Sequence, residues 1–116
     1  MPTPIEVIHT ALLHTGKVLF IAEAYAPDTV IWDPEDPVEA TAFRLLDGTA
    51  TGLTRVEGGV TKTDRLACCG HSFLSDGKLL AVGGDAPTRA TAWKFDPASE
   101  RWEPAGTMST VRWYPT

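Results

Sequence analysis

Few side chains in this chain of 116 residues combine the type and the spacing that chemistry requires. The two cysteines, Cys68 and Cys69, are adjacent, so they cannot staple a long loop as a disulfide framework does. Taken alone, Cys68 is most simply a small buried hydrophobe, and Tyr114 an amphipathic core aromatic. The histidines lie in separate segments without metal-binding spacing; they are His9, His14 and His71.

Other polar candidates have simple structural explanations. Asp33 and Asp96 occupy corresponding places in a repeat, but each precedes proline and is expected to cap a turn through its side chain. The glycine pair at 58–59 lacks the lysine and hydroxyl residue of a phosphate-binding loop. We expect His14 in a solvent-facing turn and His71 as a structural residue of a strand. The residues by themselves therefore indicate no catalytic constellation.

Composition narrows the class of protein. A hydrophobic fraction of 43% favours a packed core over disorder, and the length suits one domain. The net charge of −5 argues against a nucleic-acid-binding face. No apolar run approaches the roughly 20 residues of a membrane helix. The first residues lack the features of a signal peptide, and the sequence leaves the compartment open.

The elements expected to position these residues form two near-copies of one pattern. Each copy has a turn at a glycine, Gly16 or Gly77, followed by lysine and a hydrophobic strand. Each then has an aromatic residue before Asp-Pro, which is Trp32 in the first copy and Phe95 in the second. A repeat of this length indicates stacked structural units.

Short apolar runs separated by turn residues predict β-strands, whereas helix signals are scarce. The first copy predicts strands at 7–13, 17–22, 29–32 and 41–46, and the second at 66–74, 78–82, 90–95 and 101–104. Two four-stranded antiparallel units at this spacing fit the blades of an all-β propeller. Because propellers close with about four to eight blades, we expect an incomplete propeller.

The domain boundaries follow from this division. We expect one partial propeller domain over 1–116, with its remaining blades missing. Its parts are an irregular first blade at 5–48, a Gly- and Thr-rich linker at 49–63, a second blade at 64–111 and the start of the next blade at 112–116. An isolated chain with an open blade face should aggregate, oligomerise or be poorly stable.

The second copy resembles the kelch repeat. A hydrophobic strand at 79–82 ends at Gly83-Gly84, and Phe95-Asp96-Pro97 and then Trp102 follow. Paired glycines let the backbone pass close to a neighbouring blade, and Trp102 can supply a large apolar wedge between blades. The first copy departs from this pattern, since Ala22-Glu23 stands in place of the glycine pair.

A narrower resemblance, to the copper radical oxidases of the galactose oxidase and glyoxal oxidase family, covers residues 67–116. It rests on the segment from Ala67 to Gly77, which contains Cys68-Cys69-Gly70, and on Arg112-Trp113-Tyr114-Pro115-Thr116. In that family a cysteine is joined by a thioether to a tyrosine that binds copper and holds a radical. By position these residues match Cys68 and Tyr114. Cys69 stands where galactose oxidase has proline, so the choice of sulfur stays open.

The resemblance implies a copper-dependent oxidase. Such a protein oxidises a small aldehyde, alcohol or sugar with O₂ and forms H₂O₂. The family's second tyrosine and two histidine ligands lie downstream of the position of Tyr114. We therefore expect this chain to supply one copper ligand, to hold no cofactor alone and to be inactive alone. The alternative is a non-catalytic kelch propeller that acts as a protein-interaction or glycan-binding scaffold. Neither interpretation involves nucleic acid or a membrane.

Overall fold

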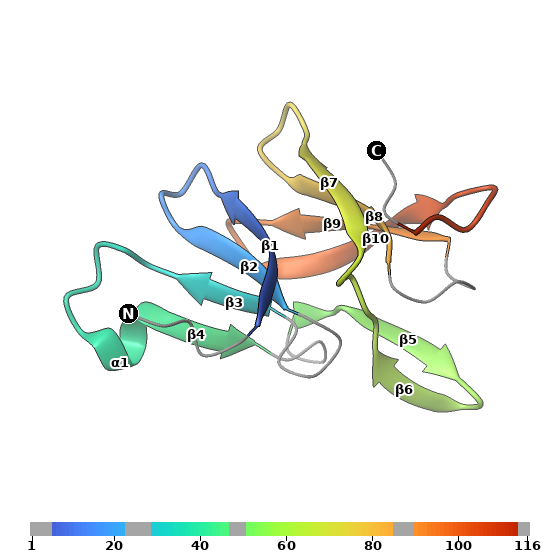
Figure 1. The fold of residues 1–116 in the computed structure, drawn as a ribbon, viewed down its shortest axis with the longest axis horizontal. Coiled ribbons are helices and arrows are strands. Elements are labelled where there is room, and N and C mark those ends of the chain that lie inside the picture. The colour runs from blue at the N-terminus through green and yellow to red at the C-terminus, as the bar shows by residue number, and fades with distance from the viewer. Residues whose placement is uncertain (1–5, 23–28, 47–50, 85–89, 114–116) are drawn as a thin grey trace.

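A computed structural model describes residues 6–22, 29–46, 51–84 and 90–113. These residues form two four-stranded antiparallel sheets and a separate two-stranded hairpin (Figure 1). In the described parts the strands of each sheet follow one another in chain order, so each sheet is a simple meander. Within the same residues, no helix is long and apolar enough to cross a membrane.

The first sheet is built as the first copy of the repeat predicts. Its strands are β1 (Val7–Leu12), β2 (Val18–Ala22), β3 (Thr29–Trp32) and β4 (Phe43–Leu46), in the order β1-β2-β3-β4. The β1–β2 turn is closed by the Leu13 amide, which donates to the Lys17 carbonyl at 2.8 Å. Gly16 has a φ of 84°, a conformation that favours glycine.

The second sheet repeats this arrangement. Its strands are β7 (Cys69–Phe73), β8 (Leu79–Gly83), β9 (Thr91–Asp96) and β10 (Arg101–Thr107), which pair in chain order. Gly77, in the turn between β7 and β8, has a φ of 86°. The predicted all-β class and the two four-stranded antiparallel blades of an incomplete propeller are confirmed.

A single helical turn replaces the start of one predicted strand. The strand predicted at 41–46 begins only at Phe43, because α1 (Glu39–Ala42) precedes it. The amides of Thr41 and Ala42 donate to the Val38 carbonyl at 3.0 and 2.9 Å. The first two residues of the predicted strand therefore make helical rather than sheet hydrogen bonds.

The segment expected to join the blades contains a β-hairpin. It consists of β5 (Thr54–Glu57) and β6 (Val60–Thr63), with the glycine pair at 58–59 in its turn. Both glycines have positive φ angles, 59° and 76°, which suit a tight hairpin turn. The hairpin pairs only with itself among the described residues, since it forms its own two-stranded sheet.

A buried carboxylate connects this hairpin to the second blade. Asp64 follows β6 directly and is 2% exposed. Its Oδ2 accepts a hydrogen bond from Trp93 Nε1 at 2.8 Å, and Arg55 of β5 lies 3.6 Å from its Oδ1. The Asp64 amide donates to the Leu53 carbonyl at 2.9 Å. The base of the hairpin is thereby fixed to β9.

The main hydrophobic core lies between the two four-stranded sheets. The first sheet contributes side chains such as Leu19 and Ile31, and the second contributes Leu79, Phe95 and Trp102. Trp102 is 3% exposed, and its ring centre lies 5.1 Å from that of Phe95. Burial of these large side chains supplies most of the free energy that holds one blade against the other.

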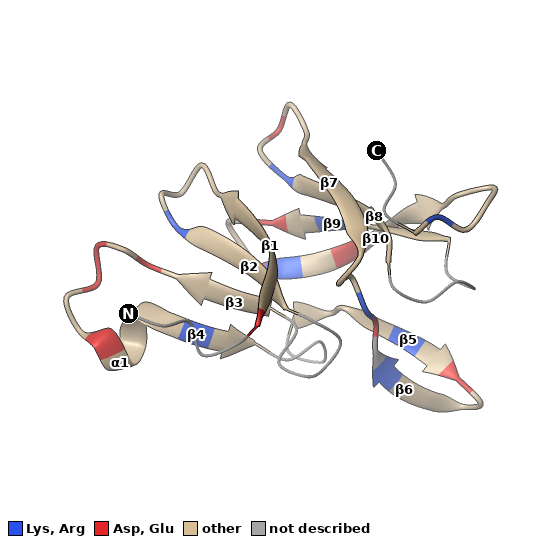
Figure 2. Ribbon diagram, in the orientation of Figure 1, with Lys and Arg blue, Asp and Glu red and all other residues tan. Residues whose placement is uncertain are grey.

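Polar contacts also join the blades. Inside the core, Trp102 Nε1 donates to Thr29 Oγ1 across the two sheets at 3.1 Å. At the surface, Glu100 of the second blade forms ion pairs with Arg44 and, at 3.5 Å, with Lys17 of the first. Figure 2 shows charged residues of both signs in the strands of the second sheet and in the hairpin, whereas the acidic residues near the first sheet lie outside its strands. The buried bond joins a strand of each sheet, whereas the exposed ion pairs add little stability.

Candidate functional site

The two adjacent cysteines differ in burial. Cys69 is the first residue of β7, is buried and lies opposite Gly83 of β8. Burial raises the pKa of the Cys69 thiol to about 12, so this sulfur stays protonated. Cys68 lies just before the strand and is half-buried. Both are free thiols, and Cys68 is the more accessible of the two.

The glycine pair at the end of β8 lets three backbone segments come together. A Cβ atom on Gly84 would lie 2.5 Å from the Arg65 carbonyl oxygen, and the φ of Gly84 is 153°. The close approach at Gly84 is therefore to the backbone that leads into β7 of the same blade. The Gly84 amide also donates to the Arg112 carbonyl at 3.4 Å.

This contact brings the end of the described chain to the start of β7. Arg112 lies beside Gly84, and Gly84 follows the residue paired with Cys69. Tyr114, the predicted partner of Cys68, lies outside the described residues. It follows Arg112 by two positions, and two residues of extended chain span at most about 7 Å.

Two histidines meet between β1 and β7, the first strands of the two blades. His9 lies on β1 and His71 on β7, and their ring centres are 5.0 Å apart with the planes at 83°. His9 Nε2 lies 2.7 Å from the Ala67 carbonyl oxygen. Burial, with a smaller effect from the charge of His9, lowers the pKa of His71. Sequence reasoning missed this pair because the two residues belong to different copies of the repeat.

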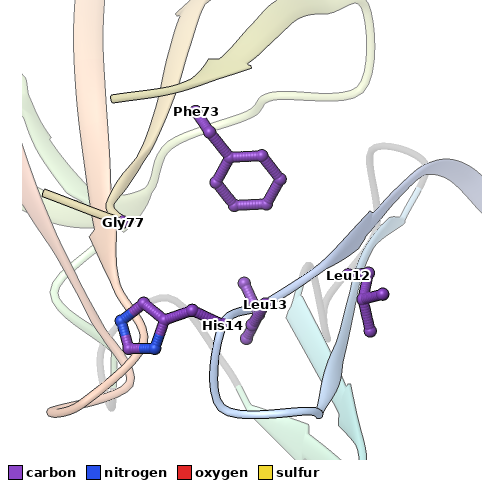
Figure 3. Close-up of a pocket in the computed structure, with 5 residues that line it drawn as sticks. All are labelled: Leu12, Leu13, His14, Phe73 and Gly77. Atoms are coloured by element: carbon purple, nitrogen blue, oxygen red, sulfur yellow. The ribbon is translucent and has the colours of Figure 1, made fainter. Parts of the chain in front are cut away.

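The third histidine lies at the turn end of the blades. His14 is exposed, as predicted, and leans toward the β7–β8 turn, where a Cβ atom on Gly77 would lie 2.3 Å from its Cδ2. Between the two turns is a pocket of about 320 Å³ (Figure 3). Its lining is mainly apolar and comprises Leu12, Leu13, His14, Phe73 and Gly77. It can accept a small apolar group but contains no pair of groups for acid–base chemistry.

The proposed turn-capping carboxylates behave as expected. Asp33 Oδ1 accepts from the Glu35 amide at 3.0 Å, and Asp96 Oδ1 accepts from the Ala98 amide at 2.9 Å. Both aspartates are thus engaged in local turns after β3 and β9. Across the described ranges, no group of three or more His, Cys, Asp or Glu side chains could hold a metal ion.

Comparison with known proteins agrees with the architecture of the second sheet. No curated protein matches this chain. A protein-family comparison finds a match at residues 67–109, which includes all of β7, β8, β9 and β10. The matching family is the Kelch motif, so the second blade carries the kelch repeat and the fold is that of kelch-type blades of an incomplete propeller.

Proposed function

We propose that this chain is part of a copper radical oxidase-like protein in which Cys68 and Tyr114 become covalently linked. One observation supports the pairing most directly: the Gly84 amide hydrogen bonds to the Arg112 carbonyl, beside the start of β7. The segment that leads to Tyr114 thereby returns to the segment that contains Cys68. A bond between Cys68 and Tyr114 requires these two segments to lie close together.

The burial of the two thiols supports Cys68 as the linked residue. Cys69 is buried against Gly83, and its raised pKa keeps it protonated and unreactive. Cys68 is half-buried just before β7 and is the more accessible of the two thiols. Forming the thioether removes one hydrogen from the thiol and one from the tyrosine ring, and O₂ accepts both electrons.

The role of Tyr114 follows from the chemistry of its phenol. A free tyrosine has a pKa of about 10, so a phenolate at neutral pH needs a bound cation. Oxidised copper favours nitrogen and oxygen ligands, and it would supply one-electron chemistry next to the phenolate. A sulfur substituent on the ring makes one-electron oxidation of the tyrosine easier. The oxidised tyrosine could then help to take two electrons from an aldehyde, alcohol or sugar.

The test uses the protein that contains this chain together with its remaining blades. After copper loading in air, the intact mass should fall by two hydrogens relative to the copper-free form. Cys68→Ser and Tyr114→Phe should each abolish that loss, and Cys69→Ser serves as the matched control that should retain it. Retention of the full mass in the copper-treated wild-type protein would argue against the link.

The alternative function is a non-catalytic kelch scaffold that binds a protein or a glycan. The Kelch motif at 67–109 is equally compatible with it, because a fold supports many functions. The two hypotheses differ in what they require of one residue pair. A scaffold has no use for a bond between Cys68 and Tyr114, whereas the oxidase depends on it.

A further inference from the structure

The histidine pair between the blades has a geometry that suits a metal ion. His9 and His71 come from β1 and β7, the first strands of their sheets, and their ring centres are 5.0 Å apart. Zinc binds ring nitrogens at about 2.0–2.1 Å in tetrahedral geometry, which holds the centres of two ligating imidazoles about 5 Å apart. The observed separation therefore matches that of two imidazoles on one zinc ion.

The hydrogen bond of His9 fixes which nitrogen could bind a metal. A carbonyl oxygen can only accept, so His9 Nε2–H must donate to the Ala67 oxygen at 2.7 Å. In the neutral ring, Nδ1 then carries a lone pair. Histidines that bind metals commonly donate their other ring N–H to a backbone carbonyl in this way, which fixes the tautomer and the ring orientation.

The second imidazole is accessible. The His71 side chain is exposed, so an ion can reach it from solvent. His9 is half-buried and held in place, so one ligand is fixed and the other can adjust.

We propose that His9, through Nδ1, and His71 bind one borderline divalent cation such as Zn²⁺ between the two blades. Water completes the coordination, because the described ranges contain no group of three His, Cys, Asp or Glu side chains that could hold a metal ion. Zinc favours imidazole ligands and has no redox chemistry. The site is therefore independent of copper oxidation and of any bond at Cys68, and it would act as a reversible clamp between β1 and β7.

Isothermal titration of the chain with Zn²⁺ tests the site, and the third histidine provides the control. His9→Gln and His71→Gln should each weaken zinc binding at least about tenfold, since losing even an outer-shell partner costs about 10- to 100-fold. Glutamine at position 9 can still donate to the Ala67 carbonyl, which protects the fold. His14→Gln should bind zinc as the wild-type chain does. Equal weakening in all three variants, or none in the first two, would overturn the proposal.

Two further readouts separate this site from other sources of zinc affinity. Long-range nitrogen NMR should show Zn²⁺ shifting His9 Nδ1 while Nε2 keeps its proton. Because binding joins two sheets in the folded state, zinc should raise the melting temperature of the wild-type chain and of Cys68→Ser alike. Loss of zinc binding in Cys68→Ser, with the histidine variants unaffected, would assign the ion to the thiol and refute the histidine site.

Discussion

Both blades contain an aromatic residue followed by Asp-Pro, but the side chain of this aromatic residue is buried to a different extent in each blade. In the second blade Phe95 is fully buried against the first sheet, next to Trp102. In the first blade Trp32 is only half-buried, and it stacks on Phe43 with ring centres 5.7 Å apart. Trp32 and Phe43 lie on the face opposite Ile31, because successive residues of a strand alternate between faces.

Strand register explains the difference. Trp32 pairs with Val18 and Phe95 with Leu79, and each partner stands two residues after the glycine of its turn. The aromatic residue therefore occupies the same place in both blades and faces the same side of its own sheet. For Phe95, the first blade covers that side. For Trp32, no other described sheet covers it. Equivalent residues thus differ in burial because of their neighbours, as expected at one side of an incomplete propeller.

The largest effect should come from removing the buried aromatic of the second blade. Trp102→Ala leaves a cavity between the sheets and should lower the free energy of unfolding by about 3–5 kcal/mol. Phe43 is the equivalent residue of the first blade, because it pairs with Trp32 as Trp102 pairs with Phe95. Phe43→Ala removes a half-buried ring and should cost about 1–2 kcal/mol. Urea denaturation compares the two. Equal costs would mean that the outer face of the first blade is as well packed as the interface.

The hairpin should reveal a second asymmetry, since Asp64 at its base ties it to the second blade. Asp64→Ala removes the acceptor of the buried Trp93 hydrogen bond and the partner of Arg55. The expected loss is about 2–3 kcal/mol, typical of a buried hydrogen bond to a charged group. Asp33→Ala, at an exposed turn of the first blade, should change stability by less than about 1 kcal/mol. A smaller effect for Asp64 than for Asp33 would contradict the buried anchor.

The polar link between the blades should have a smaller effect. Thr29→Val keeps the shape of the side chain but leaves Trp102 Nε1 without its acceptor, at a cost of about 1–2 kcal/mol. In the Trp102→Phe background the same change should cost less, because no donor remains. Denaturation of both single variants and the double variant gives the coupling energy. A coupling near zero would show that the bond does not contribute to holding the blades together.

The smallest effect concerns pH at the histidine pair. The folded state lowers the pKa of His71 below its ordinary value of 6.5, first through burial and then through the charge of His9. The unfolded chain therefore takes up this proton first, so stability is full above about pH 6.5 and falls as the pH decreases toward the folded-state pKa. His71→Gln should flatten this part of the curve, measured by urea denaturation with a chelator present. An unchanged slope would mean that His71 titrates normally.

Much of the fold could be predicted from the sequence because its signals are local. Glycine turns and alternating apolar runs indicated both meanders. The hairpin was missed because β5 and β6 are mainly polar, and a buried residue that follows them, Asp64, holds their base to the blade. The helical turn was missed because α1 has four residues, too few for any apolar period.

The candidate site was less predictable because it depends on contacts between distant segments. The motif position favoured Cys68 over Cys69, but the difference in burial between the two thiols arises from the pairing of Cys69 with Gly83 and could not be predicted. The approach of Arg112 to Gly84 and of His9 to His71 likewise required the packing of complete sheets. Motif resemblance identified the candidate residues, and tertiary packing determined their surroundings.

Peptide mapping of the copper-treated protein tests the central proposal most directly. Trypsin should cut after Arg65, Lys78 and Arg112, so Cys68 and Tyr114 fall in separate peptides unless they are joined. We expect a species that combines the peptide 66–78 with the one beginning at Trp113, two hydrogens lighter than their sum, with fragment ions that assign the bond to Cys68. Recovery of both peptides unlinked after copper and O₂ treatment would contradict it.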